Sequence, residues 1–117
     1  MIGHGYEWGY ALVEAAKEYP DIKFIQIGGS RGTEAPNLTS AEFKGYELGY
    51  MVGKVAASLS GENKKLGFAG DAKIQTLTAE VFAIKAAVKE TDPSIEVIDV
   101  YTGSWADIAA GKKLLNS

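Results

Sequence analysis

Few side chains in this chain of 117 residues could carry covalent or acid–base chemistry. His4 is the sole histidine and there is no cysteine, so a nucleophile–base pair would have to use His4. The segment with Gly-x-Ser-x-Gly spacing, Gly28–Gly32, leads into a proline-containing loop and not directly into a helix, so it does not form the strand–turn–helix that presents a nucleophilic serine, and we find no clustered set of metal-ligating residues. These absences predict a protein that is not an enzyme and has no cofactor, with His4 in a hydrogen-bonding or ligand-contacting role.

The glycine-containing segments do not complete a phosphate-binding loop. Gly111–Lys113 lacks the upstream glycine and the following serine or threonine of a P-loop. Gly28–Gly32 follows a predicted strand but leads into a proline-containing loop, so the dinucleotide fingerprint is weak. Asn37-Leu38-Thr39 matches a glycosylation triplet, a pattern common by chance, and we attach no role to it.

The elements that position the polar residues follow from hydrophobic periodicity. Helices are predicted over Glu7–Tyr19, Ala41–Leu59, Thr76–Glu90 and from about Trp105 onward. Strands are predicted around Ile2 and over Ile22–Ile27, Lys65–Ala69 and Ile95–Tyr101, with a brief extended stretch at Leu38–Thr39. This alternation predicts an α/β fold, a mostly parallel sheet flanked by helices with flavodoxin-like topology.

Ligands of such sheets bind at the C-terminal ends of the strands. Here these ends are small and polar: Gly3–Gly5, Gly28–Ser30, Gly70–Asp71 and Gly103–Ser104. Glycine at these ends lets a ligand approach the backbone, but it is also typical of ordinary turns between a strand and a helix. For any single strand end, both interpretations remain open.

The second predicted helix has an unusual pattern. We expect Ser40 as its N-cap and Glu42 in its first turn. We expect its inward face to hold Leu48, Met51, Val52, Val55 and Leu59. Glycines recur every four residues at Gly45, Gly49 and Gly53. Because each costs about 1 kcal/mol against alanine in a helix, they predict close backbone packing against a neighbouring element.

The composition limits the partners. A net charge of -3 argues against nucleic acid, and no run of about 18 apolar residues is present to cross a membrane. The first residues lack the basic and apolar regions of a signal peptide. The chain begins in what resembles a strand and stops in what resembles a helix, so both ends look cut.

Two tryptophans follow predicted strand ends. Trp105, after Gly103-Ser104, is placed where its ring could stack on a ligand. Trp8 begins an apolar stripe, which favours a place in the core. Asp107 could bond a sugar hydroxyl or cap the last helix, and capping is the commoner role.

Several segments, taken in order, resemble the basic membrane protein family of solute-binding lipoproteins, which includes nucleoside-binding members. These segments are Tyr19–Phe24, Asn37–Thr39, Glu42–Lys54, Lys65–Gly70, Tyr101–Asp107 and Gly111–Lys112. The resemblance covers nearly the whole chain. It implies a type I periplasmic-binding-protein fold that feeds an ABC importer, with a nucleoside-like small molecule held between two α/β lobes. It also implies an extracytoplasmic, lipid-anchored location and an ABC transporter permease as partner.

On this resemblance, residues 1–36 correspond to the end of the first lobe and 37–117 to the start of the second, and the two could also fold as one unit. Trp105 falls on the aromatic position of a Gly-Ser-aromatic motif near the ligand, and Asp107 on its acidic position. Gly5 and Tyr6 fall on the edge loop of the first lobe. Asp71 falls on the edge of the second.

The chain also departs from the family pattern. Gln75 stands where a proline is common, the helix around Val81–Ala87 lacks a frequent glycine, and Trp8 and Tyr10 look atypical. A second hypothesis is therefore a truncated or engineered flavodoxin-like unit that has lost ligand binding. Its exposed sheet edges would then favour homo-oligomers.

Overall fold

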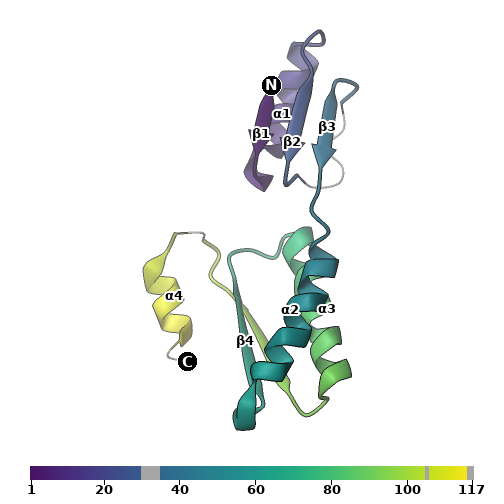
Figure 1. Ribbon diagram of the computed structural model, residues 1–117. Coiled ribbons are helices and arrows are strands. Elements are labelled where there is room, and N and C mark those ends of the chain that lie inside the picture. Colours follow the sequence, from purple (N-terminus) through teal and green to yellow (C-terminus); the bar gives the residue numbers. More distant parts are fainter. Residues whose placement is uncertain (30–34, 105, 116–117) are drawn as a thin grey trace. The chain divides into compact units, whose positions relative to one another are not determined.

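The computed structural model describes residues 1–29, 35–104 and 106–115 (Figure 1). The chain forms two compact units, Met1–Phe43 and Lys44–Ser117. Each unit has its own sheet, and the named strands of the described residues all pair with one another in parallel. The predicted α/β class with parallel strands and flanking helices is confirmed, although the strands form two sheets and not one.

The first unit is a three-stranded sheet covered by one helix. Strands β1 (Ile2–His4), β2 (Phe24–Ile27) and β3 (Leu38–Ala41) pair in that order. A 3-10 turn, η1 (Tyr6–Trp8), leads from β1 into helix α1 (Gly9–Glu18). The core consists of Leu12, Ala16, Phe24 and Leu38. Leu12 and Ala16 reach the sheet together because residues four apart share one face of a helix.

The border between the two compact units lies after Phe43. The stretch at Leu38 extends to a full strand, β3, which pairs in register with β2 through Phe24 and Leu38. This pairing binds residues 38–41 to the first unit. The correspondence of residues 1–36 and 37–117 to the family's two lobes stays a prediction.

The second unit is a parallel strand pair with helices beside it. Strand β4 (Lys65–Gly70) pairs with β5 (Glu96–Tyr101) along its full length. Figure 1 shows α2 (Gly45–Leu59) and α3 (Gln75–Thr91) side by side. A short turn, η2 (Gly61–Asn63), precedes β4, and α4 (Ile108–Leu115) follows β5.

Helix α3 buries the face that its periodicity predicts. Val81, Ile84 and Val88 are buried, and Leu77 is half-buried. Ile84 and Val88 form the core of the second unit with Ala57 and Ile95. None of the helices in the described residues is long and apolar enough to cross a membrane.

Helix α2 begins later than expected. Ser40 and Ala41 are paired with Gln26 and Ile27 in the first sheet, so neither can start a helix. The helix begins at Gly45, and the acidic residue of its first turn is Glu47. The predictions of Ser40 as N-cap and Glu42 in the first turn are therefore wrong.

The buried face of α2 is the glycine face. Gly49, Gly53 and Ala57 are buried, and a β-carbon at Gly53 would come 2.6 Å from the carbonyl oxygen of Ile84 in α3. The predicted close backbone packing is thus present. The larger side chains face outward and are between 42% and 77% exposed: Leu48, Met51, Val52, Val55 and Leu59. The prediction that they face inward is wrong, because the opposite face of the helix, with Gly49 and Gly53, is the one that contacts α3.

Candidate ligand-binding site

The ends of β4 and β5 are held together by backbone hydrogen bonds. The amide of Thr102 donates to the carbonyl oxygen of Gly70 over 2.9 Å, and the amide of Gly103 donates to the carbonyl oxygen of Asp71. Gly103 has a φ of 75°, a conformation that glycine adopts readily. The two loops that leave the sheet therefore stay side by side at its C-terminal edge.

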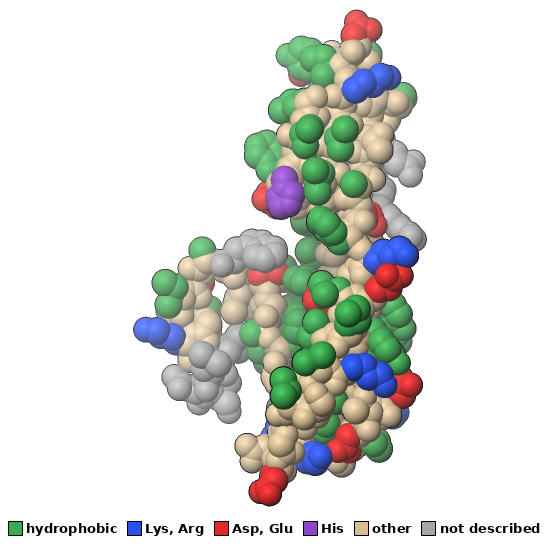
Figure 2. All heavy atoms as spheres, viewed as in Figure 1, with side chains coloured by type: hydrophobic (Ala, Val, Ile, Leu, Met, Phe, Trp, Pro, Cys, Tyr) green, Lys and Arg blue, Asp and Glu red, His purple; other side chains and the backbone are tan. Residues whose placement is uncertain are grey.

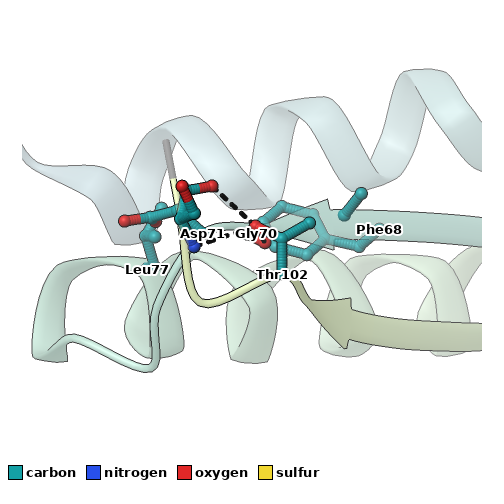
Figure 3. A pocket seen from close by; sticks show the side chains of 7 residues that line it. Phe68, Gly70, Asp71, Leu77 and Thr102 are labelled. Carbon is teal, nitrogen blue, oxygen red and sulfur yellow. Dashed lines mark hydrogen bonds between the residues drawn. The ribbon is translucent and has the colours of Figure 1, made fainter. Parts of the chain in front are cut away.

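A cavity of about 280 Å³ lies at this edge (Figure 3). Its lining combines apolar and polar groups: Phe68, Ala69, Gly70, Asp71, Leu77, Thr102 and Ser104. Figure 3 shows Asp71 between Gly70 and Leu77, with Phe68 further along β4. The volume lies just below the roughly 300–1,000 Å³ of sites that enclose a drug-sized ligand. The cavity can therefore take a part of such a ligand, of the size of a sugar or a base.

Asp71 is the unusual residue of this cavity. Only 9% of its surface is exposed, and its Oδ1 has no hydrogen-bond partner among the described residues. A buried polar atom that lacks a partner costs about 1–3 kcal/mol. Native structures contain few such atoms, and each calls for an explanation.

Ser104 and Asp107 organise the turn that leads to α4. Ser104 Oγ accepts hydrogen bonds from the amides of Ala106 and Asp107, both over 3.2 Å. Asp107 Oδ1 accepts from the amide of Ala110 over 2.9 Å. Because α4 begins at Ile108, Asp107 occupies its N-cap position. Of the two roles expected for Asp107, the structure displays capping.

A second hollow, of about 240 Å³, lies where Tyr101, Lys73 and Lys85 meet. Lys85 forms an ion pair with Asp99 and thereby holds the pKa of that carboxyl below its usual range. Burial raises the pKa of Tyr101, and the Lys73 ammonium lies 5.2 Å from the centre of its ring. These charged groups already have partners within the hollow, so we assign no ligand to it.

The first sheet has a glycine-rich edge of its own. The amide of Gly5 donates to the carbonyl oxygen of Ile27 over 2.9 Å, and Gln26 Nε2 donates to the carbonyl oxygen of Gly5 over 3.0 Å. Gly5 adopts a φ of 116°. Tyr6 begins η1 and is 41% exposed. Gly5 thus connects two strand ends, and Tyr6 stands beside it with ring surface available.

Only one of the two tryptophans can be compared with its predicted place. Trp8 is 47% exposed, so its predicted place in the core is wrong. The helix proper begins at Gly9, and Leu12 and Ala16 supply the face that covers the sheet. Trp105 lies outside the described residues.

Two buried amides were not predicted from the sequence. Gln26 is 0% exposed at the Gly5 edge. Asn37 is 8% exposed, and its Nδ2 donates to three carbonyl oxygens, of Ala16, Tyr19 and Ile22, over 2.8–3.0 Å. These bonds connect the end of α1 to the start of β3. Gln26 lies on the same face of β2 as the buried Phe24. Its alternation with Ile25 and Ile27 would by itself have placed this polar side chain on a solvent face, so the sequence pattern did not signal its burial.

The two glycine-rich edges belong to different sheets. The structure groups Gly5 with Tyr6 in the first unit, and Asp71 with Ser104 and Thr102 in the second. Parallel strands with polar loops at their C-terminal ends define the class of open α/β ligand-binding proteins.

Within that class, the chain belongs to the Bmp family, described as ABC transporter substrate-binding protein PnrA-like, whose model matches residues 1–117. The chain is 32% identical over 114 residues to transcriptional activator protein med of Bacillus subtilis, covering 97% of this chain. It is 30% identical over 112 residues to basic membrane protein A of Borreliella burgdorferi, covering 94% of this chain. It is 32% identical over 114 residues to the ABC transporter nucleoside-binding protein BmpA of Lactococcus lactis, again covering 97%. The chain spans about a third of the length of these curated relatives (34%, 33% and 32%).

Solved structures show the same fold. A transcriptional activator of the comK gene from Bacillus halodurans matches with a TM-score of 0.74 and 29% identity, covering 98% of this chain and 38% of the other. An ABC transporter solute-binding protein from Conexibacter woesei matches with a TM-score of 0.61 and 28% identity, covering 96% and 38%. The family resemblance read from the sequence is confirmed.

Proposed function

We propose that the chain forms part of a solute-binding protein of an ABC importer and binds a nucleoside-like molecule without chemical conversion. The observation that carries this proposal is the cavity at the ends of β4 and β5, with Asp71 and Ser104 in its lining. Its position is the one where open α/β sheets bind ligands. Its size suits a sugar or a base, and the family is one of substrate-binding proteins.

We also include in the proposed site the residues carried over from the resemblance. Trp105 would stack on the base, and Tyr6 and Gly5 would belong to the other edge. Asp107 would have to contact the ligand through the oxygen that does not cap α4. The extracytoplasmic location, the lipid anchor and the permease partner are parts of the same proposal, as is the correspondence of the two segments to two lobes.

The test is a titration with a panel of nucleosides, followed by calorimetry and by tryptophan fluorescence. Saturable heat that disappears in Trp105→Ala and survives in Trp8→Phe supports the proposed site. The Trp8 variant is the matched control, because Trp8 is the second tryptophan and lies in the first unit. Absence of heat and of quenching at millimolar nucleoside would refute the proposal for this chain.

A second candidate function is that of a self-associating structural unit. The observation that favours it is the outward face of α2, where Leu48, Val52, Val55 and Leu59 are all exposed. Their spacing of four, three and four residues is that of the apolar positions in paired helices. Hydrophobic side chains along this helix are visible in Figure 2. A helix face of this kind suits a second copy, in addition to the exposed sheet edges expected from the sequence.

A further inference from the structure

The carboxylate of Asp71 is enclosed and incompletely bonded. It follows directly after the last residue of β4, it lines the cavity, and its Oδ1 is without a hydrogen-bond donor among the residues that the structure describes. An ionised carboxylate only accepts hydrogen bonds. The group that would complete this site must therefore be a donor.

The surrounding backbone keeps Asp71 where it is. Its carbonyl oxygen accepts from Gly103, and the carbonyl oxygen of the preceding Gly70 accepts from Thr102. A shift of Asp71 toward solvent would break the connection between the two strand ends. The nearest lysine in the sequence, Lys73, has its ammonium over the ring of Tyr101. No described residue supplies this donor to Asp71 Oδ1, so we look to a bound molecule for it.

We propose that Asp71 accepts a hydrogen bond from a hydroxyl or amino group of the bound ligand. This inference rests on the proposed function and names the polar group by which the ligand is recognised. The hydroxyl of Ser104 and the Gly70 backbone line the same cavity and add no positive charge. A phosphate or carboxylate of the ligand placed here would therefore be repelled by the Asp71 carboxylate, whereas a hydroxyl or amino donor would be accepted.

The donor of a nucleoside can come from the sugar or from the base. We would measure adenosine, 2′,3′-dideoxyadenosine and purine riboside, which lacks the amino group of adenosine, on the wild-type chain and on Asp71→Asn. We expect Asp71→Asn to weaken adenosine binding at least tenfold. One of the two analogues lacks the group that donates to Asp71. We expect the wild type to bind that analogue as weakly as Asp71→Asn binds adenosine. The affinity for that analogue should then be the same in the wild type and in Asp71→Asn. Asp92→Asn, at the end of α3, is the matched control and should leave binding unchanged.

The outcomes separate this inference from the proposed function. If the wild type binds none of the three molecules, the proposed function fails and this inference fails with it. If the wild type binds adenosine and Asp71→Asn binds it equally well, only the inference is overturned. Thermal unfolding without ligand checks that the variant folds, and we expect a midpoint at or above that of the wild type. A midpoint below the wild type would show that Asp71 already has a stabilising partner, which also overturns the inference.

Discussion

Gly53 of α2 lies against the backbone of Ile84 in α3, and a β-carbon at position 53 would come 2.6 Å from the Ile84 carbonyl oxygen and 2.8 Å from Cβ of Ala87. Real β-carbons do not approach backbone atoms so closely, and a helix backbone cannot yield as a flexible side chain can. The two helices are therefore in contact because position 53 has no side chain.

Gly53→Ala should destabilise the second unit. The gain in helix propensity is about 1 kcal/mol. Forcing the helices apart costs typically 1–3 kcal/mol. We expect a net loss of on the order of 1 kcal/mol in the free energy of unfolding, measured with urea. Gly45→Ala is the matched control, because the nearest atom to its β-carbon would be 3.6 Å away. The packing argument fails if both substitutions have the same effect.

Asn37→Ala should destabilise the first unit. The substitution removes the donor for the carbonyl oxygens of Ala16, Tyr19 and Ile22. The Tyr19 oxygen keeps the amide of Ile22 as a donor, and a buried acceptor that is left without a partner costs about 1–3 kcal/mol. We expect a loss of about 2–4 kcal/mol in the free energy of unfolding. Trp8 fluorescence in a Trp105→Phe background reports on this unit. The exposed Ser58, changed to alanine, is the control, and an equally small effect at both positions would contradict the assignment.

Asp107→Ala should reduce the helix content of α4. The lost N-cap is worth about 0.5–2 kcal/mol, and the effect should be local and visible by amide exchange at Ala110. Asp107→Asn keeps a side-chain acceptor and should retain the helix. If the asparagine variant keeps the helix but binds nucleosides more weakly, Asp107 has a ligand role as well as a capping role. If alanine leaves exchange at Ala110 unchanged, the cap is not formed in solution.

The stability of the second unit should depend on Asp92 at acid pH. Hydrogen bonds from Lys64 over 2.7 Å and from Ser94 hold the pKa of this carboxyl well below its usual range. A carboxyl whose pKa is lowered by folding stabilises the folded state above its unfolded pKa of about 3.9, and this contribution is lost as the pH falls through the folded value. We expect the unfolding free energy to be level above about pH 5 and to fall below about pH 4.

Asp92→Asn should flatten that acid decline, measured by urea unfolding at a series of pH values. Asp21→Asn, an exposed carboxyl of the first unit, is the control and should leave the decline of the second unit unchanged. The same slope in the Asp92 variant as in the wild type would show that the Lys64 pair does not persist in solution.

The apolar face of α2 predicts a concentration-dependent dimer. In an antiparallel pair centred between Val52 and Val55, each Val52 would face the other copy's Val55. Val52→Glu and Val55→Lys should each lower the dimer fraction in sedimentation equilibrium. The double variant should recover it, because each Glu would then face a Lys. A monomer at all concentrations would contradict the second candidate function, and failure of the double variant would exclude this pairing.

The sequence by itself determined the α/β class, the family and most of the elements. The spacing of Val81, Ile84 and Val88 specified the buried face of α3, because α3 has a single apolar stripe. It also determined that α2 packs closely through Gly49 and Gly53, since repeated glycines in a helix are costly without such packing. The sequence also placed Asp71 at the C-terminal edge of the sheet, because it directly follows a predicted parallel strand and ligands of such sheets bind at that edge.

Only the tertiary structure decided which atoms meet. Periodicity identified an apolar face on α2 but could not show that α3 contacts the opposite face, because the choice depends on how closely two backbones approach. The extent of β3 and the burial of Asn37 depend on contacts across the first unit, which local patterns do not contain. The enclosed Oδ1 of Asp71 arises from the arrangement of two strand ends separated by thirty residues of sequence, roughly the length of a βαβ crossover. Hydrophobic periodicity reports what a segment can bury, and the rest of the fold determines what covers it.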